Sequence, residues 1–229
     1  MTSMCSALLL DLDGTLLDTA PDMGGALNRL RVEAGREPLP LAMIRPVVSH
    51  GAMRLVSLGF PEATGAEFER LRLRFLDLYS QNLAEGTRLF PGMEPVLDEL
   101  ARLGLPWGIV TNKPGWLTDP LLAALGLHER ASCVVSGDTL AERKPHPLPL
   151  LHAAAIVGVA PGYCIYVGDA ERDIQAGRAA GMTTVVAAYG YISADDDPAG
   201  WQPTGIVAEP IELLDWIGAT SAGAIGERR

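Results

Sequence analysis

The chain has 229 residues, of which 48% are hydrophobic and 20% are charged. This length and apolar content suit one large domain, or a core with a smaller lobe. The formal net charge of -10 argues against binding of nucleic acid or of an anionic membrane, because both need a basic surface.

The cysteines and apolar stretches indicate the compartment. Cys5, Cys133 and Cys164 each stand in an apolar, strand-like context, which is typical of buried free thiols in a reducing compartment. The first apolar run follows no basic segment, so we expect no signal peptide. Residues 148–167 are apolar but are interrupted by glycine and proline, so we expect no membrane span. We therefore predict a cytoplasmic protein.

The first predicted element is a buried strand over residues 6–10 that ends in Asp11-Leu12-Asp13-Gly14-Thr15-Leu16. Side chains alternate along an extended chain, so Asp11 and Asp13 point to the same side. Two carboxylates this close repel each other unless they share a cation or a proton. A lone Asp-Gly is often only a turn, but two aspartates directly after a buried strand favour a functional site.

The next segment, residues 18–89, has a helical pattern throughout. Apolar residues recur at three- and four-residue spacing, as in Leu71, Phe75 and Leu78. This segment is too long for a single crossover helix between two strands. We therefore predict a small helical domain over 18–89, inserted into a core made of 1–17 and 90–229.

Further short β-rich runs alternate with helical patterns along the rest of the chain. Continuous apolar strands between helices indicate a parallel sheet that is covered on both faces. The predicted fold class is therefore α/β, a doubly wound parallel sheet of the Rossmann-like kind. Ligands of such sheets bind at the carboxyl ends of the strands. The predicted strands of this region are 107–110, 132–136, 163–167, 183–187 and 205–208.

Two motifs that follow these strands suit an anion. Thr111-Asn112-Lys113 supplies a hydroxyl and backbone N–H groups at a strand end, which can form an oxyanion cradle. Lys144-Pro145 precedes a helical segment, and proline is common at a helix start. Taken alone, Lys144 could equally be a solvated surface lysine.

A third motif, Gly168-Asp169-Ala170-Glu171-Arg172-Asp173, follows the strand 163–167. Asp169 lies at the tip of that strand. With Asp11 and Asp13 it provides the hard oxygen ligands that Mg²⁺ prefers. Asp173 could instead only favour the helix N-terminus electrostatically.

Together and in this order, these segments resemble the motifs of the haloacid dehalogenase-like hydrolase superfamily. The resemblance covers nearly the whole chain, and the helical insert resembles the cap that this superfamily carries after its first motif. It implies a haloacid dehalogenase-type core and a Mg²⁺-dependent phosphatase that forms an aspartyl-phosphate. The implied partner is a small phosphorylated metabolite.

The resemblance also implies a role for each motif residue. Asp11 would be the nucleophile, and Asp13 the general acid that protonates the leaving oxygen and then activates water. Mg²⁺ would be held by Asp11, the backbone carbonyl of Asp13, and Asp169, while Asp173 would lie behind these direct ligands. The residues that would hold the phosphoryl oxygens are Thr111, Asn112 and Lys144.

Departures from the superfamily pattern narrow the assignment. Ala170 stands where many relatives carry a second aspartate, so Asp173 must supply the fourth carboxylate. Asp13 distinguishes the chain from true dehalogenases, which lack that acid. Leu12, where ion-pumping ATPases carry lysine, argues against that class.

Other segments suggest a substrate. Residues 17–22, 112–114 and 189–191 resemble the phosphoglycolate phosphatase group, and N-acetylmuramic acid 6-phosphate phosphatases share these features. The Tyr191-Ile192 run leading to Trp201 leans towards the second group. We expect phosphoglycolate first and N-acetylmuramic acid 6-phosphate second. A phosphosugar mutase and a non-catalytic binding module are the alternatives from other classes.

Cap residues are expected to choose the substrate, and residues 45–53 resemble the superfamily's specificity loop. Arg45 is the candidate for a substrate carboxylate, because guanidinium pairs bidentately with carboxylate, although it could be a plain surface arginine. Ser49, His50 and Gly51 complete the predicted substrate residues. No feature of the sequence predicts an oligomeric state. The remaining histidines, interpreted as surface or helix residues, are His128, His146 and His152.

Overall fold

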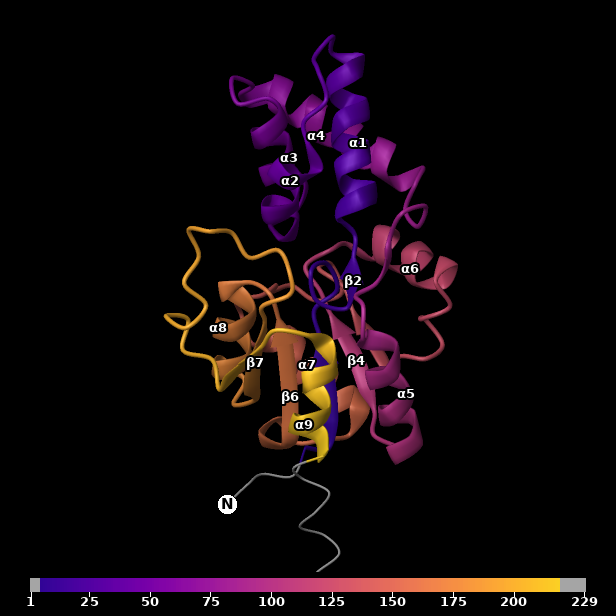
Figure 1. Cartoon of the computed structure of the whole chain (residues 1–229), viewed down its shortest axis with the longest axis vertical. Helices are drawn as coiled ribbons and strands as arrows, with labels where there is room; N and C mark the ends of the chain where they lie inside the picture. Colours follow the sequence, from indigo (N-terminus) through magenta and orange to yellow (C-terminus); the bar gives the residue numbers. More distant parts are fainter. Residues whose placement is uncertain (1–4, 219–229) are drawn as a thin grey trace, which may run out of the picture.

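Six parallel strands form a single sheet in the order β5-β4-β1-β6-β7-β8. A computed structural model describes residues 5–218 and is drawn in Figure 1. Each predicted strand is present to within one residue at either end, and the predicted α/β fold is confirmed. The strands are β1 (Ala7–Leu10), β4 (Trp107–Val110), β5 (Cys133–Val135), β6 (Cys164–Gly168), β7 (Thr183–Ala187) and β8 (Gly205–Val207).

Side chains alternate between the two faces along each strand, and in the central strands β1, β4 and β6 both faces are buried. In β1, Leu8 and Leu10 join one apolar cluster and Ala7 and Leu9 join another. This burial on both sides explains why the strands are apolar without interruption. The first cluster is completed by α5 (Met93–Leu103), α6 (Gly115–Ala124) and α9 (Leu213–Gly218), and the second by α7 (Leu148–Val157) and α8 (Glu171–Ala179).

A group of helices stands above the sheet in Figure 1, and we call it the cap. Its apolar cluster includes Leu27, Phe75 and Leu78 and extends to Leu117 and Tyr191 of the core. Its members follow the helical pattern of the sequence, with a 3₁₀ turn in the middle. They are α1 (Ala20–Glu33), α2 (Leu41–Ile44), η1 (Arg45–His50), α3 (Gly51–Gly59) and α4 (Gly65–Ser80).

The two chain segments that join cap and core pair with each other. β2 (Leu17–Asp18) and β3 (Arg88–Leu89) form a short antiparallel ladder. The predicted boundaries at 17/18 and 89/90 fall within or directly after these two strands, and the division into domains stays a prediction. Within residues 5–218, no helix is long and apolar enough to cross a membrane.

The cap's stability is expected to depend on Phe75. Its side chain is fully buried and stacks on Tyr79 at a centroid distance of 6.3 Å. Phe75→Ala should lower the free energy of unfolding by about 3–5 kcal/mol, because it leaves a cavity. Leu73→Ala, on the same helix but 55% exposed, should cost less than about 0.5 kcal/mol. Urea denaturation measures both, and equal losses would contradict this account of the cap.

Candidate active site

Three aspartates meet at the carboxyl edge of the sheet. Asp11 follows β1 and Asp169 follows β6, and these strands pair in parallel with Leu10 opposite Val167. The backbone N–H of Asp11 extends the ladder by donating to the Val167 carbonyl at 2.9 Å. Asp11, Asp169 and Asp173 are all buried, and one oxygen from each lies within 4.8 Å of the others.

Lys144 lies between two of these carboxylates. Its Nζ is 2.8 Å from Oδ1 of Asp11 and 2.8 Å from Oδ1 of Asp173, and the side chain is almost fully buried. Burial alone would raise the pKa of Asp173, but Lys144 and then Arg172 outweigh it, and the pKa is lowered. For Asp11, burial outweighs Lys144 and the pKa is raised. Lys144 therefore offsets part of the repulsion within the cluster.

Asp169 has one carboxylate oxygen without a partner. Its Oδ2 accepts hydrogen bonds from the Ser49 hydroxyl at 2.6 Å and the Tyr191 N–H at 2.9 Å. Its buried Oδ1 has no hydrogen-bond partner. Burial, together with the charges of Asp11 and Asp173, raises the pKa of Asp169 to about 7. Buried polar atoms are nearly always satisfied, so this cluster fits a divalent cation bound by oxygen ligands.

Gly14 allows the first motif to approach Asp169. Its φ is +85°, a conformation that favours glycine, and a Cβ atom there would lie 2.0 Å from Oδ2 of Asp169. A Cβ atom at Gly190 would likewise lie 2.5 Å from the Asp169 Cβ. The glycine of the predicted motif is therefore required both for the turn and for the packing of the carboxylate.

Asp13 is held separately from that cluster. Its Oδ1 accepts a hydrogen bond from the Thr19 hydroxyl at 2.7 Å, and the Lys113 ammonium lies 2.9 Å from Oδ1 and 3.2 Å from Oδ2. Lys113 is buried, and the ion pair with Asp13 raises its pKa although burial opposes this. Lys113 was not among the predicted site residues, although it belongs to the predicted Thr-Asn-Lys motif.

The predicted phosphate-binding residues differ in what their side chains offer. Asn112 is engaged with the backbone of Lys144: its Nδ2 donates to the carbonyl at 2.9 Å and its Oδ1 accepts from the N–H at 3.1 Å. The Thr111 hydroxyl is buried and accepts the Lys113 N–H at 3.1 Å. Asn112 thus positions the segment that carries Lys144, and its side chain has little left for a ligand.

A cleft of about 590 Å³ opens between the core and the cap. Asp11, Asp13 and Thr111 line it from the core. Its size lies within the usual range of about 300–1,000 Å³ for small-molecule sites. The cap contributes Ser49, His50, Gly51, Met53 and Tyr79, and further core residues are Trp116, Arg143 and Arg172.

The structure brings three of the four predicted substrate residues to this cleft. Ser49, His50 and Gly51 line it, but Arg45 does not belong to the lining. The Arg45 guanidinium instead pairs with Asp18 at 2.9 Å and lies over the Tyr191 ring.

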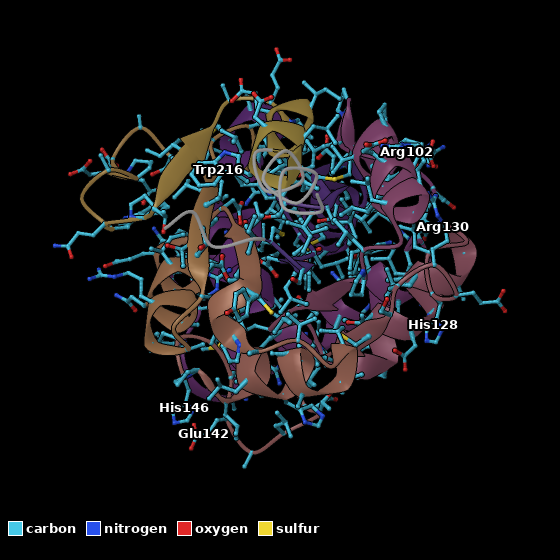
Figure 2. All side chains as sticks on the ribbon, turned by 90° about the horizontal axis from the view of Figure 1, so that it is seen from below. Arg102, His128, Arg130, Glu142, His146 and Trp216 are labelled. Carbon is cyan, nitrogen blue, oxygen red and sulfur yellow. The ribbon has the colours of Figure 1, made fainter. Side chains whose placement is uncertain are left out.

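Arg172 is a cleft residue that the sequence interpretation passed over. It reaches from the core to the cap, where it donates to the backbone carbonyl of Ser49 at 2.7 Å. Its position directly before Asp173 in the last motif could have indicated it. The histidines outside the cap lie elsewhere: Figure 2, seen from below, places His128 and His146 at the periphery, and both are exposed.

The model of the haloacid dehalogenase-like hydrolase family matches residues 8–187. The chain belongs to this family. It is 49% identical over 209 residues to a phosphoglycolate phosphatase of Xanthomonas campestris pv. campestris (strain 8004), covering 91% of this chain and 95% of that one. It is 40% identical over 220 residues to an N-acetylmuramic acid 6-phosphate phosphatase of Pseudomonas putida, covering 95% and 98%.

Solved structures agree with the fold and the family. A predicted phosphoglycolate phosphatase from Haemophilus somnus 129PT superimposes with a TM-score of 0.82 and 28% identity, covering 92% of this chain and 97% of that one. The predicted superfamily resemblance is confirmed, and the chain is an enzyme of the phosphatase class. A non-catalytic binding module is thereby set aside.

Proposed function

We propose that the chain is a Mg²⁺-dependent phosphomonoesterase that forms an aspartyl-phosphate on Asp11 and acts on 2-phosphoglycolate. The observation that carries the proposal is the buried cluster of Asp11, Asp169 and Asp173, with the unpartnered Oδ1 of Asp169, beside a cleft that Asp11 and Asp13 line. The relatives named phosphoglycolate phosphatase support the choice of substrate.

Charge supports the need for a cation. The acidic cluster contains three carboxylates, Asp11, Asp169 and Asp173, which are opposed by two basic groups, Lys144 and Arg172. The formal sum is therefore -1, which repels a phosphate dianion. Mg²⁺ held by Asp11, Asp169 and the backbone carbonyl of Asp13 would supply positive charge to the incoming phosphate. Asp173 would keep Lys144 in place.

The two carboxylates of the first motif then divide the chemistry. An oxygen of Asp11 attacks phosphorus while Asp13 gives its proton to the leaving oxygen, which departs with the electrons of the P–O bond. In the second step Asp13, now a carboxylate, takes a proton from the water that attacks phosphorus. The bond between phosphorus and the Asp11 oxygen breaks with its electrons going to Asp11, and inorganic phosphate leaves. The position of Asp13 at the cleft, apart from the acidic cluster, suits contact with the leaving group.

N-acetylmuramic acid 6-phosphate is the second candidate, because the cleft offers more than a two-carbon substrate fills. Exposed Met53 and Trp116 add apolar surface to it from opposite sides. Measurement of kcat/KM for both esters with the same preparation decides between them. Preference for the sugar phosphate would replace the substrate and leave the chemistry in place.

A phosphosugar mutase would return the phosphoryl group to the sugar instead of releasing it. Phosphorus NMR of the reaction mixture separates the two classes, since hydrolysis yields inorganic phosphate.

A cytoplasmic location also stays a prediction, supported by three buried cysteines that are free.

Arg45 is expected to matter less for a substrate carboxylate than its position in the cap loop predicts. The guanidinium pairs with Asp18. Arg45→Ala should therefore lower kcat/KM for 2-phosphoglycolate by less than about tenfold, whereas loss of a charge-assisted hydrogen bond to the substrate, worth roughly 1.5–3 kcal/mol, would lower it by more. Steady-state kinetics test this. A larger loss for 2-phosphoglycolate, absent for p-nitrophenyl phosphate, would restore Arg45 as the carboxylate-binding residue.

The cap is expected to close over the bound phosphate. Its contacts with the core include the short β2–β3 ladder and Ser49, whose hydroxyl donates to Asp169 and whose carbonyl accepts from Arg172. Binding of Mg²⁺ with beryllium fluoride should therefore slow hydrogen exchange of residues 45–53, because closure excludes water. Exchange that stays the same throughout residues 20–80 would argue for a fixed cap.

A further inference from the structure

The chain contains eighteen lysine and arginine residues, and only two of them are lysines. The two are Lys113 and Lys144, and both are buried, with exposures of 8% and 4%. Each pairs with one carboxylate of the first motif: Lys144 with Asp11 at 2.8 Å and Lys113 with Asp13 at 2.9 Å. All other basic residues are arginines. The two ammonium groups of the chain thus both pair with the carboxylates that are proposed to react.

The contacts of Lys113 hold the Asp13 side chain in one orientation. The ammonium lies within 3.2 Å of both carboxylate oxygens and rests 4.6 Å from the centroid of the Tyr79 ring. Its backbone is tied to Thr111 by a hydrogen bond of 3.1 Å. The Thr19 hydroxyl also donates to Oδ1 of Asp13, at 2.7 Å. With a side-chain exposure of 15%, the Asp13 carboxylate lies at the cleft but has little freedom to turn.

We propose that Lys113 is a positioning residue that orients Asp13 for proton transfer to the leaving oxygen. This inference rests on the proposed function, in which Asp13 donates that proton as the P–O bond breaks. Lysine suits the task because its ammonium is a point charge with three rotatable donors, whereas arginine presents a planar fork. Lys113 therefore acts on the leaving-group side of the reaction, while Lys144 acts beside the nucleophile.

The test compares an ester whose leaving group needs a proton with one that does not. The variant Lys113→Met keeps the length of the side chain but removes its charge. On 2-phosphoglycolate we expect kcat/KM, which reports the steps up to formation of the aspartyl-phosphate, to fall about 10²-fold, within the range that general acid catalysis supplies. On p-nitrophenyl phosphate, whose phenolate leaves unprotonated, we expect kcat/KM to fall less than about fivefold, since general acid catalysis contributes little to that step.

In kcat/KM, Asp13→Asn should show the same dependence on the leaving group, whereas its kcat should fall for both esters because Asp13 also activates the water of the second step. The double variant should be no slower than Asp13→Asn alone, because residues that act as a unit are not additive. Equal losses of kcat/KM on both esters for Lys113→Met, or additive losses in the double variant, would overturn the inference. A wild-type enzyme that releases phosphate from no ester, or an Asp11→Asn variant that stays active, would instead overturn the proposed function.

A spectroscopic measurement tests the same contact without turnover. Protein labelled with ¹³C at lysine Cε should give two lysine signals, and Lys113→Arg identifies the one that belongs to Lys113. Asp13→Asn should move that signal and leave the signal of Lys144 nearly unchanged. An unmoved Lys113 signal would overturn the inference even if Lys113→Met proved too unstable to assay.

Discussion

Asp11→Asn is expected to abolish phosphate release while leaving the chain folded. The amide has nearly the shape of the carboxylate but cannot form the proposed aspartyl-phosphate. Loss of a covalent nucleophile should lower kcat by about 10⁴-fold or more. The backbone N–H of Asp11 would still bond the Val167 carbonyl, and Lys144 would still pair with Asp173. Phosphate release by the purified variant, compared with its thermal unfolding, measures both halves of the prediction.

Asp98→Asn serves as the matched control, because that side chain is 68% exposed and bonds only to Arg130 among the described contacts. It should keep wild-type turnover. Mass spectrometry of quenched wild-type enzyme should show a phosphorylated species that Asp11→Asn lacks. Turnover of Asp11→Asn near the wild-type rate would contradict the proposed mechanism.

The sheet and the acidic cluster could be predicted because they depend on local pattern and on topology. A run such as Leu8, Leu9 and Leu10 is apolar on both faces, which only a covered parallel strand requires. Once the strands are parallel, their carboxyl ends share one edge, and residues such as Asp11 and Asp169 must meet there. Two short motifs far apart in sequence therefore define one site.

Contacts that depend on how the cap sits on the core were not predictable in this way. Arg45 pairs with Asp18 across the linker, and Lys113 lies against Tyr79 of the cap. Neither spacing nor composition determines these placements, because they follow from the path of the β2–β3 ladder and the packing of α4. The role of the Asn112 side chain is of the same kind, since it depends on where the loop carrying Lys144 returns to the strand end.

Removal of divalent cations is expected to stop turnover. Chelation by EDTA leaves the acidic cluster and the phosphate dianion to repel each other, so activity should fall to background and return with Mg²⁺. Ca²⁺ should inhibit, because it prefers more ligands and longer bonds than the octahedral geometry that Mg²⁺ imposes. Full activity after exhaustive chelation would rule the metal role out.

Mg²⁺ binding itself is expected to release a proton near neutral pH. Burial, and then the charge of Asp11, raises the pKa of Asp169 to about 7, so below pH 7 this carboxyl is mostly protonated in the free enzyme. The cation binds the carboxylate form, so its affinity should rise up to about tenfold per pH unit below the pKa and level off above it. Titration calorimetry in two buffers with different ionisation enthalpies counts the released protons. Asp169→Asn should lose both the tight binding and the proton release. An affinity that is the same at pH 6 and pH 8 would mean that Asp169 is ionised before the cation arrives, and Lys144 and Arg172 would then have to stabilise its charge.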